Sequence, residues 1–339
     1  MTTSGAPPLD ARVTMDPVYR EPGGFSPSLL ANARVVRRLL TDREHAIWHF
    51  VFAPNVASSS AARVAILARR SVPWKAWKGK VVQTIASAPR RFELAPSLLF
   101  GDVVVTLTEW TRARLLAQGV DGSNLRVIPP CSVAPSAPSA EACARLRGEL
   151  DVGTGPLFVY PGDYEVSHGA DTVARAVSAI LREAPEAHIV FACRPKTARA
   201  AAARAEIERT LTEEGVAHRT RHVGQMKDIV PLLGSATAVL FPVDDLYGKV
   251  DVPIVLLEAL ALGIPLVLAR GGPLEALAAA DFVDAGDARG LADAAVHILR
   301  EGPRERAERG RALYEARFAP AVVAAMYDEL YDEFHEDLG

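Results

Sequence analysis

The chain has 339 residues, 49% of them apolar and 23% charged, and a formal net charge of −3 at neutral pH. This is the composition of ordinary globular proteins, at a length that is comfortable for two domains. The longest apolar stretch is interrupted by Glu258, Gly263 and Pro265, and the N-terminal MTTSGAPPLDAR has no apolar core. Neither a transmembrane helix nor a secretory signal is therefore expected.

Charge and cysteine usage add two expectations. Residues 1–150 carry 19 Lys/Arg and 11 Asp/Glu, so this half is basic and the remainder is acidic. A basic half predicts contact with an anionic surface or acceptor. The cysteines, Cys131, Cys143 and Cys193, are widely spaced, odd in number and without a metal-binding pattern. They are typical of reduced thiols in the cytosol, so we expect a cytoplasmic protein without a bound metal.

Helix-like and strand-like segments alternate through the first half. Residues 25–40 have apolar residues at helical spacing, with Ser26 and Pro27 as a start signal. The next expected elements are a strand at 46–52, a helix at 59–70, strands at 80–85 and 102–107, a helix at 111–118 and a strand at 125–128. This alternation predicts a parallel sheet with helices on both faces. The Pro-, Ser- and Gly-rich segment at residues 135–155 predicts an interdomain linker.

The second half repeats the alternation more regularly. Strands are expected at 157–161, 188–192, 220–223, 238–242, 265–269 and 281–283, and helices at 170–183, 196–214, 227–234, 289–300, 304–316 and 320–335. The sequence therefore predicts the α/β class, with two Rossmann-like, doubly wound parallel-sheet domains that face a cleft. In such sheets, ligands bind beyond the carboxyl ends of the strands.

One acid, Glu258, interrupts the most apolar stretch of the chain, VPIVLLEALALGIPLVLA at residues 252–269. Asp251 is expected to cap a short helix there, and Gly263 to end that helix before a buried strand. Because glutamate is almost never buried without a partner, the carboxylate has either a ligand or a structural role. Binding of ribose or sugar hydroxyls and a structural ion pair or loop cap explain it equally well.

The second half also resembles a known family. The stretch HVGQMKDIVPLLGSATAVLFPVDDLYGKVDVPIVLLEALALGIPLVLARGG resembles the donor-binding domain of the retaining, nucleotide-sugar-dependent glycosyltransferases of the GT-B fold, family 4. DVVVTLTEWTRARLLAQGVDGSNLRVIPP resembles the end of that family's first domain, and FAPAVVAAMYDELY its last helix. The resemblance implies an acceptor-side domain at residues 1–134, a donor domain at 156–316, and a helix at 317–339 that packs back on the first domain.

The resemblance implies a metal-independent transfer of a hexose from a nucleotide diphosphate sugar to an acceptor hydroxyl, with retention of configuration. It implies no cofactor besides that donor, since helix dipoles and cationic side chains neutralise the diphosphate in this family. The motifs imply that Glu258 binds the ribose hydroxyls and that the backbone at Ile254 and Val255 faces the phosphates and the sugar. Gly162 corresponds to the glycine after the first strand of the donor domain.

The donor side departs from the family pattern at three positions. The first glutamate of the Glu-x7-Glu motif is Val250 here, and the two phosphate-binding bases are Asp163 and His168. Loss of both bases without replacement would weaken donor binding by several orders of magnitude, because each charge-assisted bond contributes roughly 1.5–3 kcal/mol. We hypothesise that Lys249 and Arg194 replace them; the alternative is that both are solvated surface bases.

Other residues complete the expected donor site. Lys196 follows a strand together with Arg194, at the carboxyl edge of the sheet, and His168 retains a hydrogen-bond donor. Asp251 either only caps its helix or replaces the missing glutamate as a sugar ligand. Asp251 and Lys249 are therefore the catalytic candidates.

The acceptor side departs from the pattern as well. The active-site histidine of the family's first domain is Ala86 here, with Ser87 beside it, and Gly23 and Gly24 are the candidates for the glycine loop. These losses support an alternative function, in which the chain is a catalytically weakened homologue that acts as a nucleotide-sugar-binding or scaffold subunit.

Aromatic and imidazole side chains give the remaining signals of the first half. Trp74 and Trp77 lie among lysines and arginines, a combination typical of bilayer interfaces. It predicts peripheral attachment to the inner face of an anionic membrane, where an enzyme that uses a lipid-linked acceptor would meet its substrate. The alternative is that the two tryptophans form a pair in the core or in the lining of the cleft. His45 and His49 flank an apolar strand without other metal ligands, and we expect a structural role. No nucleic-acid partner is expected.

Overall fold

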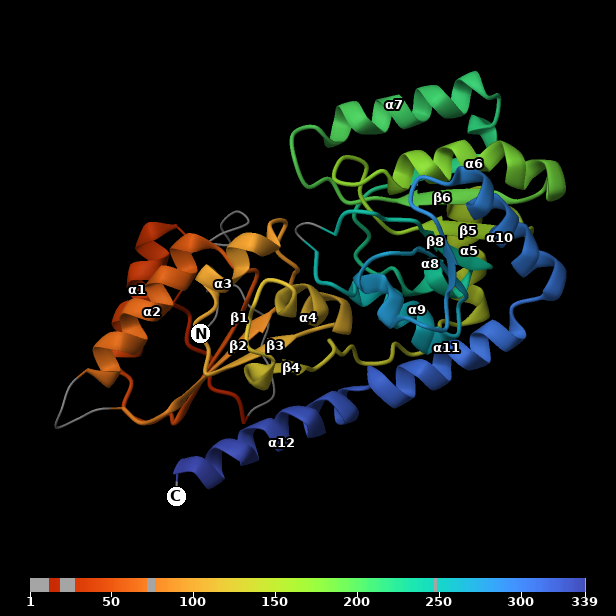
Figure 1. The fold of residues 1–339 in the computed structure, drawn as a ribbon. Coiled ribbons are helices and arrows are strands. Elements are labelled where there is room, and N and C mark those ends of the chain that lie inside the picture. Colours follow the sequence, from red (N-terminus) through yellow and green to blue (C-terminus); the bar gives the residue numbers. More distant parts are fainter. Residues whose placement is uncertain (1–11, 19–27, 72–76, 247–248, 339) are drawn as a thin grey trace. The chain divides into compact units, whose positions relative to one another are not determined.

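The computed structural model describes residues 12–18, 28–71, 77–246 and 249–338. The chain divides into two compact units, of which unit 1 spans Met1–Ile128 and Tyr327–Gly339 and unit 2 spans Pro129–Met326. Both units are parallel sheets with interleaved helices, so the predicted α/β class is confirmed (Figure 1).

Residues 135–155 are part of unit 2 and not a separate linker. They contain helix α5 (Ala140–Glu149), and Leu146 and Leu150 at its end pack against the buried strand residues Leu157 and Val190. Arg147 of this helix donates hydrogen bonds to three backbone carbonyls of unit 2. The abundance of Pro and Ser on either side of α5 concealed this apolar face.

Unit 1 is built on a four-stranded parallel sheet in the order β1-β2-β3-β4. Its strands are β1 (Ile47–Phe52), β2 (Lys80–Ile85), β3 (Val103–Thr106) and β4 (Leu125–Val127), and its helices are α1 (Leu29–Thr41), α2 (Val56–Arg70), α3 (Ala95–Leu98), α4 (Glu109–Leu116) and part of α12 (Pro320–Leu338). The caps explain two shifted boundaries. Ser28 caps α1 and Asn55 caps α2, each accepting a hydrogen bond from a backbone N–H three residues further on.

The two histidines of the β1 region have structural partners. His49 Nδ1 lies 2.7 Å from Tyr331 Oη of α12, and its Nε2 lies 2.7 Å from Thr84 Oγ1 of β2. Burial lowers the pKa of His49 to about 4, so the imidazole is neutral near pH 7. His45 Nδ1 lies 2.7 Å from Asp42 Oδ1. Both residues therefore have the structural role that we expected.

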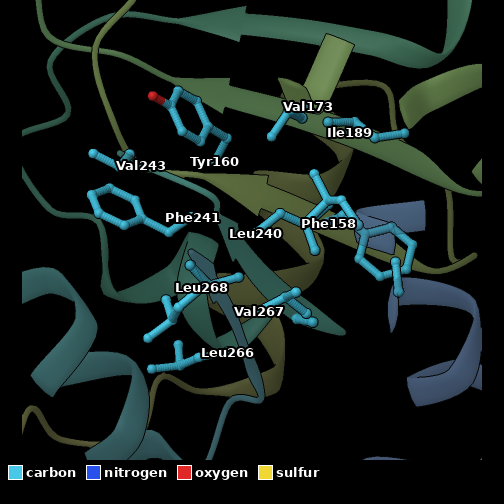
Figure 2. Packing of buried hydrophobic residues seen from close by; sticks show 14 of the residues in the cluster. Phe158, Tyr160, Val173, Ile189, Leu240, Phe241, Val243, Leu266, Val267 and Leu268 are labelled. Carbon is cyan, nitrogen blue, oxygen red and sulfur yellow. The ribbon is translucent and has the colours of Figure 1, made fainter. Parts of the chain in front are cut away.

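Unit 2 is built on a six-stranded parallel sheet in the order β10-β9-β8-β5-β6-β7. Its strands are β5 (Leu157–Tyr160), β6 (His188–Ala192), β7 (Thr220–Val223), β8 (Ala238–Phe241), β9 (Leu266–Ala269) and β10 (Asp281–Val283). Three of these strands, β5, β8 and β9, are buried at every position, which is why they read as continuous apolar runs in the sequence. Figure 2 shows Phe158, Leu240 and Val267 from three neighbouring strands in this core.

Helices cover both faces of this sheet (Figure 1). The remaining helices of unit 2 are α6 (Gly169–Glu183), α7 (Ala200–Glu213), α8 (Val230–Gly234), α9 (Ile254–Leu262), α10 (Ala288–Glu301) and α11 (Arg304–Arg317). Helix α6 packs on α7 and α10, whereas α9 packs on α8 and α11. The order of the strands reverses at β5, which lies between β6 and β8. Such a switch point leaves a crevice at the carboxyl ends of the two strands on either side of it.

Helix α9 carries Glu258 and begins later than the sequence suggested. Pro253 occupies the N-cap without a side-chain hydrogen bond, so the interpretation of Asp251 as the cap is wrong. Gly263 ends the helix in the left-handed conformation at φ 74°, as predicted. Asp251 is fully buried in the segment that leads into the helix.

Candidate active site

A pocket of about 480 Å³ opens at the carboxyl edge of the unit 2 sheet, where the strand order reverses. It is lined by residues that follow four parallel strands and by the first turn of α9: Pro161, Gly162, Ala192, Arg194, Lys196, Gly224, Gln225, Met226, Ile229, Phe241, Lys249, Val250, Pro253, Ile254 and Val255. A larger groove lies between α6 and α10, but its Arg289 and Arg300 are ion-paired with Asp293 and Glu183. The sheet-edge pocket differs from this groove because it lies at the carboxyl ends of parallel strands and includes the first turn of α9.

The structure brings together in this pocket six of the residues that the sequence singled out. They are Gly162, Arg194, Lys196, Lys249, Ile254 and Val255. Val250, at the position of the missing glutamate, also lines the pocket. Helix α9 presents its N-terminal backbone N–H groups here, and Ile254 at its first position is 40% exposed.

The pocket contains an ion cluster that the sequence did not reveal. The carboxylate of Asp163 is fully buried, and its Oδ2 lies 2.5 Å from Lys249 Nζ and 3.4 Å from Lys196 Nζ. Asp163 Oδ1 accepts a hydrogen bond of 3.0 Å from the N–H of Val166. The resemblance led us to expect a phosphate-binding base at position 163. The structure has an acid there instead, and its carboxylate is ion-paired with two lysines that line the pocket.

The charges of this cluster perturb one another. Burial raises the pKa of Asp163, but Lys249, Lys196 and the Val166 N–H more than offset this effect, so the pKa lies below its ordinary value. Burial and the neighbouring Lys249 lower the pKa of Lys196, while Asp163 opposes them. Arg194 has no ion pair or hydrogen bond from its side chain to the described residues and is exposed at the pocket.

A second acid ties the two loops that carry these residues. Glu165 Oε1 accepts hydrogen bonds from the backbone N–H groups of Lys196 (2.7 Å) and Thr197 (2.8 Å). The loop after β5 is thereby joined to the loop after β6. No pattern in the sequence indicated this contact, because the role depends on which strands are neighbours.

His168, expected to bind the donor, points elsewhere. Its Nδ1 lies 2.7 Å from Asp244 Oδ2, and its backbone N–H donates to Asp244 Oδ1. The hydrogen bond and charge of Asp244 raise the pKa of His168. His168 is exposed and does not line the pocket. Its partner Asp244 lies in the loop after β8.

Glu258 is half-buried rather than enclosed in a dry site. It lies one helical turn beyond Ile254 and Val255, which places it on their side of α9. Burial and the charge of Asp228 raise the pKa of its carboxyl group. Glu258 makes neither a hydrogen bond nor an ion pair with the residues that the structure describes, so the structural ion pair considered above is not formed with them. Glu258 does not itself line the pocket, but its carboxylate remains available to a ligand that extends one turn along α9.

The remaining predicted site residues belong to unit 1 or lie outside the described ranges. Ser87 follows the carboxyl end of β2 and is 8% exposed. Gly23, Gly24 and Trp74 fall outside the described residues. Trp77 stacks on the core residue Trp48 with ring centroids 4.1 Å apart, and its Nε1 donates to the His45 carbonyl. Trp77 is therefore a packed side chain, as the alternative reading had it.

Two further properties concern the described residues as a whole. Among them, no group of three or more His, Cys, Asp and Glu side chains could hold a metal ion. Within the same ranges, every helix is too short or too polar to cross a bilayer.

Comparisons with known proteins agree with this geometry. Residues 155–301 match the family model described as glycosyl transferases group 1. No curated protein sequence matches the chain. The fold is shared with HepE from Anabaena in complex with UDP and glucose, at 15% identity over 89% of this chain and 81% of that chain, with a TM-score of 0.74.

Two other solved structures show the same architecture. Sucrose-phosphate synthase from Thermosynechococcus elongatus is 20% identical over 91% of this chain and 79% of that chain, with a TM-score of 0.72. The lipopolysaccharide outer core galactosyltransferase WaaB, in its apo form, is 13% identical over 90% of this chain and 81% of that chain, with a TM-score of 0.60. At these identities the likeness establishes the fold.

Residues 155–301 thus form a glycosyl transferase group 1 domain, and the chain has the GT-B fold. The predicted resemblance to GT-B glycosyltransferases and the prediction of a glycosyltransferase are confirmed, whereas family 4 and retention of configuration stay predictions.

Proposed function

We propose that this glycosyltransferase takes a hexose from a nucleoside diphosphate sugar and transfers it to an acceptor hydroxyl, with retention of configuration and without a metal ion. One observation carries the proposal: Arg194, Lys196, Lys249 and the N-terminus of α9 converge on a single pocket at the switch point of the sheet. A diphosphate is the ligand whose charge and size suit this set. HepE, which shares the fold, has been solved with UDP and with UDP-glucose.

The residues have distinct roles in this proposal. Arg194 is exposed in the pocket and contacts the phosphates directly, together with the N–H groups at Ile254 and Val255. Lys249 and Lys196 supply positive potential from the pocket wall.

Other predicted residues act around the phosphates. Glu258 accepts hydrogen bonds from the ribose hydroxyls, and Gly162 lines the pocket beside the donor. Asp251 is fully buried and does not line the pocket, so its contact with the sugar stays a proposal. His168 positions the loop after β8 through its contacts with Asp244.

The chemistry requires no nucleophile from the protein. The bond between the anomeric carbon and the phosphate oxygen breaks while the acceptor oxygen bonds to the same carbon from the same face. The departing phosphate oxygen takes the proton of the acceptor hydroxyl. Negative charge grows on the diphosphate during this step, and the α9 dipole and the three cations stabilise it.

We further propose that residues 156–316 hold the donor and residues 1–134 the acceptor side, with Ser87 at the end of β2 among its residues and the helix at 317–339 packing back on that domain. We propose a cytoplasmic enzyme that associates with the inner face of the membrane and uses a lipid-linked acceptor. The excess of Lys and Arg over Asp and Glu in residues 1–150 supports this association, whereas Trp77 does not. Equal pelleting with anionic and neutral vesicles would rule it out.

Ligand binding followed by turnover tests the central proposal. Thermal shift and calorimetry with UDP, GDP, ADP and their sugars identify the donor, and hydrolysis or transfer of the sugar then establishes catalysis. Arg194→Gln should weaken donor binding roughly tenfold or more, whereas Arg289→Gln in the α6–α10 groove should leave it unchanged. Equal effects of the two variants would refute the assignment of the pocket.

The second candidate is a catalytically weakened homologue that binds a nucleotide sugar or acts as a scaffold. Val250 and Ala86 favour it, because neither can act as the acid or imidazole expected at its position. Tight donor binding without hydrolysis or transfer, across a panel of acceptors, would support this candidate.

A further inference from the structure

Asp163 connects three loops at the edge of the donor pocket. It lies after β5, and its Oδ2 is shared by Lys196, which follows β6, and Lys249, which lies between β8 and α9. The side chain of Asp163 is fully buried, that of Lys196 is 6% exposed and that of Lys249 is 11% exposed. Among the described residues, this is the only cluster in which one carboxylate is ion-paired with two lysines.

This cluster is not balanced by itself. One carboxylate faces two ammonium groups, so the buried group carries a net positive charge when both lysines are protonated. Both Nζ atoms are shielded from solvent and have no hydrogen-bond partner among the described residues, although each is ion-paired with Asp163. A buried charge without full compensation is unfavourable unless an anion approaches it. Both lysines line the pocket where such an anion would bind.

We propose that Asp163 is a positioning residue for the donor diphosphate: its carboxylate keeps Lys196 and Lys249 charged and in place at the pocket wall, so that an acid supports the binding of an anion. The inference rests on the proposed donor function of this pocket. It assigns to Asp163 a role that acts through the lysines and not through contact with the nucleotide.

The reason is that two ammonium groups cannot remain together in a dry site without a carboxylate. Burial and the charge of Lys249 both lower the pKa of Lys196, and Asp163 counteracts them. Without Asp163, one lysine would release its proton or move into solvent. Either change would remove a preorganised charge from the pocket and would break the ion pairs that join the loop after β5 to Lys196 and Lys249.

The other titratable groups around the cluster do not replace Asp163. Glu165 accepts hydrogen bonds from the backbone N–H groups of Lys196 and Thr197, and Arg194 is exposed at the pocket without an ion pair to the described residues. Tyr160 donates to the Asp163 carbonyl, and burial raises its pKa. Burial likewise raises the pKa of Cys193 to about 12. Tyr160 and Cys193 are therefore neutral where the lysines are charged.

The test is UDP binding by Asp163→Asn, measured calorimetrically at neutral pH with GDP and ADP as parallel probes. Direct Coulomb attraction predicts tighter binding when a negative charge is removed. The positioning role predicts the opposite sign, with affinity lower by roughly tenfold, equivalent to the loss of one charge-assisted contact. Unchanged or tighter binding would overturn the inference. Asp293→Asn, an exposed acid of α10 paired with Arg289, is the matched control and should not change the affinity.

A thermodynamic cycle separates positioning from general loss of structure. Lys249→Met should weaken UDP binding in the wild-type protein but have little further effect in the Asp163→Asn background, because the lysine is no longer held there. Equal effects in both backgrounds would overturn the proposal. Circular dichroism and thermal unfolding establish whether Asp163→Asn is folded.

The pH dependence provides a readout that does not require Asp163→Asn to fold. At pH values at which UDP is fully ionised, the affinity of the wild-type protein for UDP should fall as the pH rises through the pKa of Lys196. Lys196→Arg, which stays charged, should move this fall to higher pH; an identical alkaline profile would contradict the inference. Failure of the wild-type protein to bind any nucleoside diphosphate would overturn the proposed function and this inference with it. Binding without dependence on Asp163 would overturn the inference alone.

Discussion

Glu258→Gln is the sharpest test of ribose recognition. The substitution keeps the size and shape of the side chain and removes its charge. In the native protein Glu258 is half-buried one helical turn beyond the pocket residues Ile254 and Val255, does not itself line the pocket, and makes no hydrogen bond to the described residues. Burial and Asp228 raise its pKa. A hydroxyl that donates to this group in a partly dry site should contribute roughly 1.5–3 kcal/mol, whereas the neutral amide should contribute about 1 kcal/mol.

The assay compares UDP with its 2′-deoxy and 3′-deoxy analogues in both proteins. The wild-type enzyme should bind the analogue that lacks the contacted hydroxyl about 10- to 100-fold more weakly than UDP. In Glu258→Gln, UDP itself should bind more weakly, and its advantage over that analogue should largely disappear. Glu206→Gln on the exposed face of α7 controls for a change of net charge. If both proteins discriminate equally against both analogues, Glu258 does not bind the ribose and the assignment is wrong.

Two further predictions concern stability. The pKa of His49 is about 4 in the folded chain against about 6.5 in the unfolded one, so the free energy of unfolding should decrease by up to roughly 3 kcal/mol as pH falls from about 6.5 to about 4. In denaturant titrations His49→Gln should flatten this pH dependence, whereas the control His297→Gln should not. An unchanged slope in His49→Gln would count against the buried neutral imidazole. A Cβ at Gly162 would fall 2.3 Å from Cζ of the buried Tyr160, so Gly162→Ala should destabilise unit 2 by about 1–3 kcal/mol and lower its Tm by several degrees. Gly224→Ala, in the same pocket but with open space around its Cβ, should have little effect, and equal Tm values for the two variants would contradict the packing argument.

Much of the fold was accessible from the sequence because buried parallel strands and amphipathic helices leave strong local patterns. Strands such as β5 and β9 are apolar throughout, and Gly263 ended α9 where its conformational freedom predicted. Boundaries set by single side chains were less accessible. Asn55 starts α2 earlier than expected, and Pro253 starts α9 later than expected.

The site was only partly predictable, for a physical reason. Arg194 and Lys196 were placed at the pocket because residues after parallel strands share one edge of the sheet. The ion pairs of Lys196 and Lys249 with Asp163 depend on the strand order, in which β5 lies between β6 and β8, and on side-chain directions. The sequence showed Asp163 as a lost base, whereas the structure shows it as the partner of two bases. For the same reason the pairing of His168 with Asp244 was not foreseen.

The most direct measurement for the whole account is a crystal structure with a bound nucleoside diphosphate. We expect the diphosphate in the pocket at the carboxyl ends of β5 and β6, with its oxygens within hydrogen-bond distance of the Arg194 guanidinium and of the first N–H groups of α9. Density for the nucleotide at another place in the protein, with Arg194 and α9 uncontacted, would contradict the central claim.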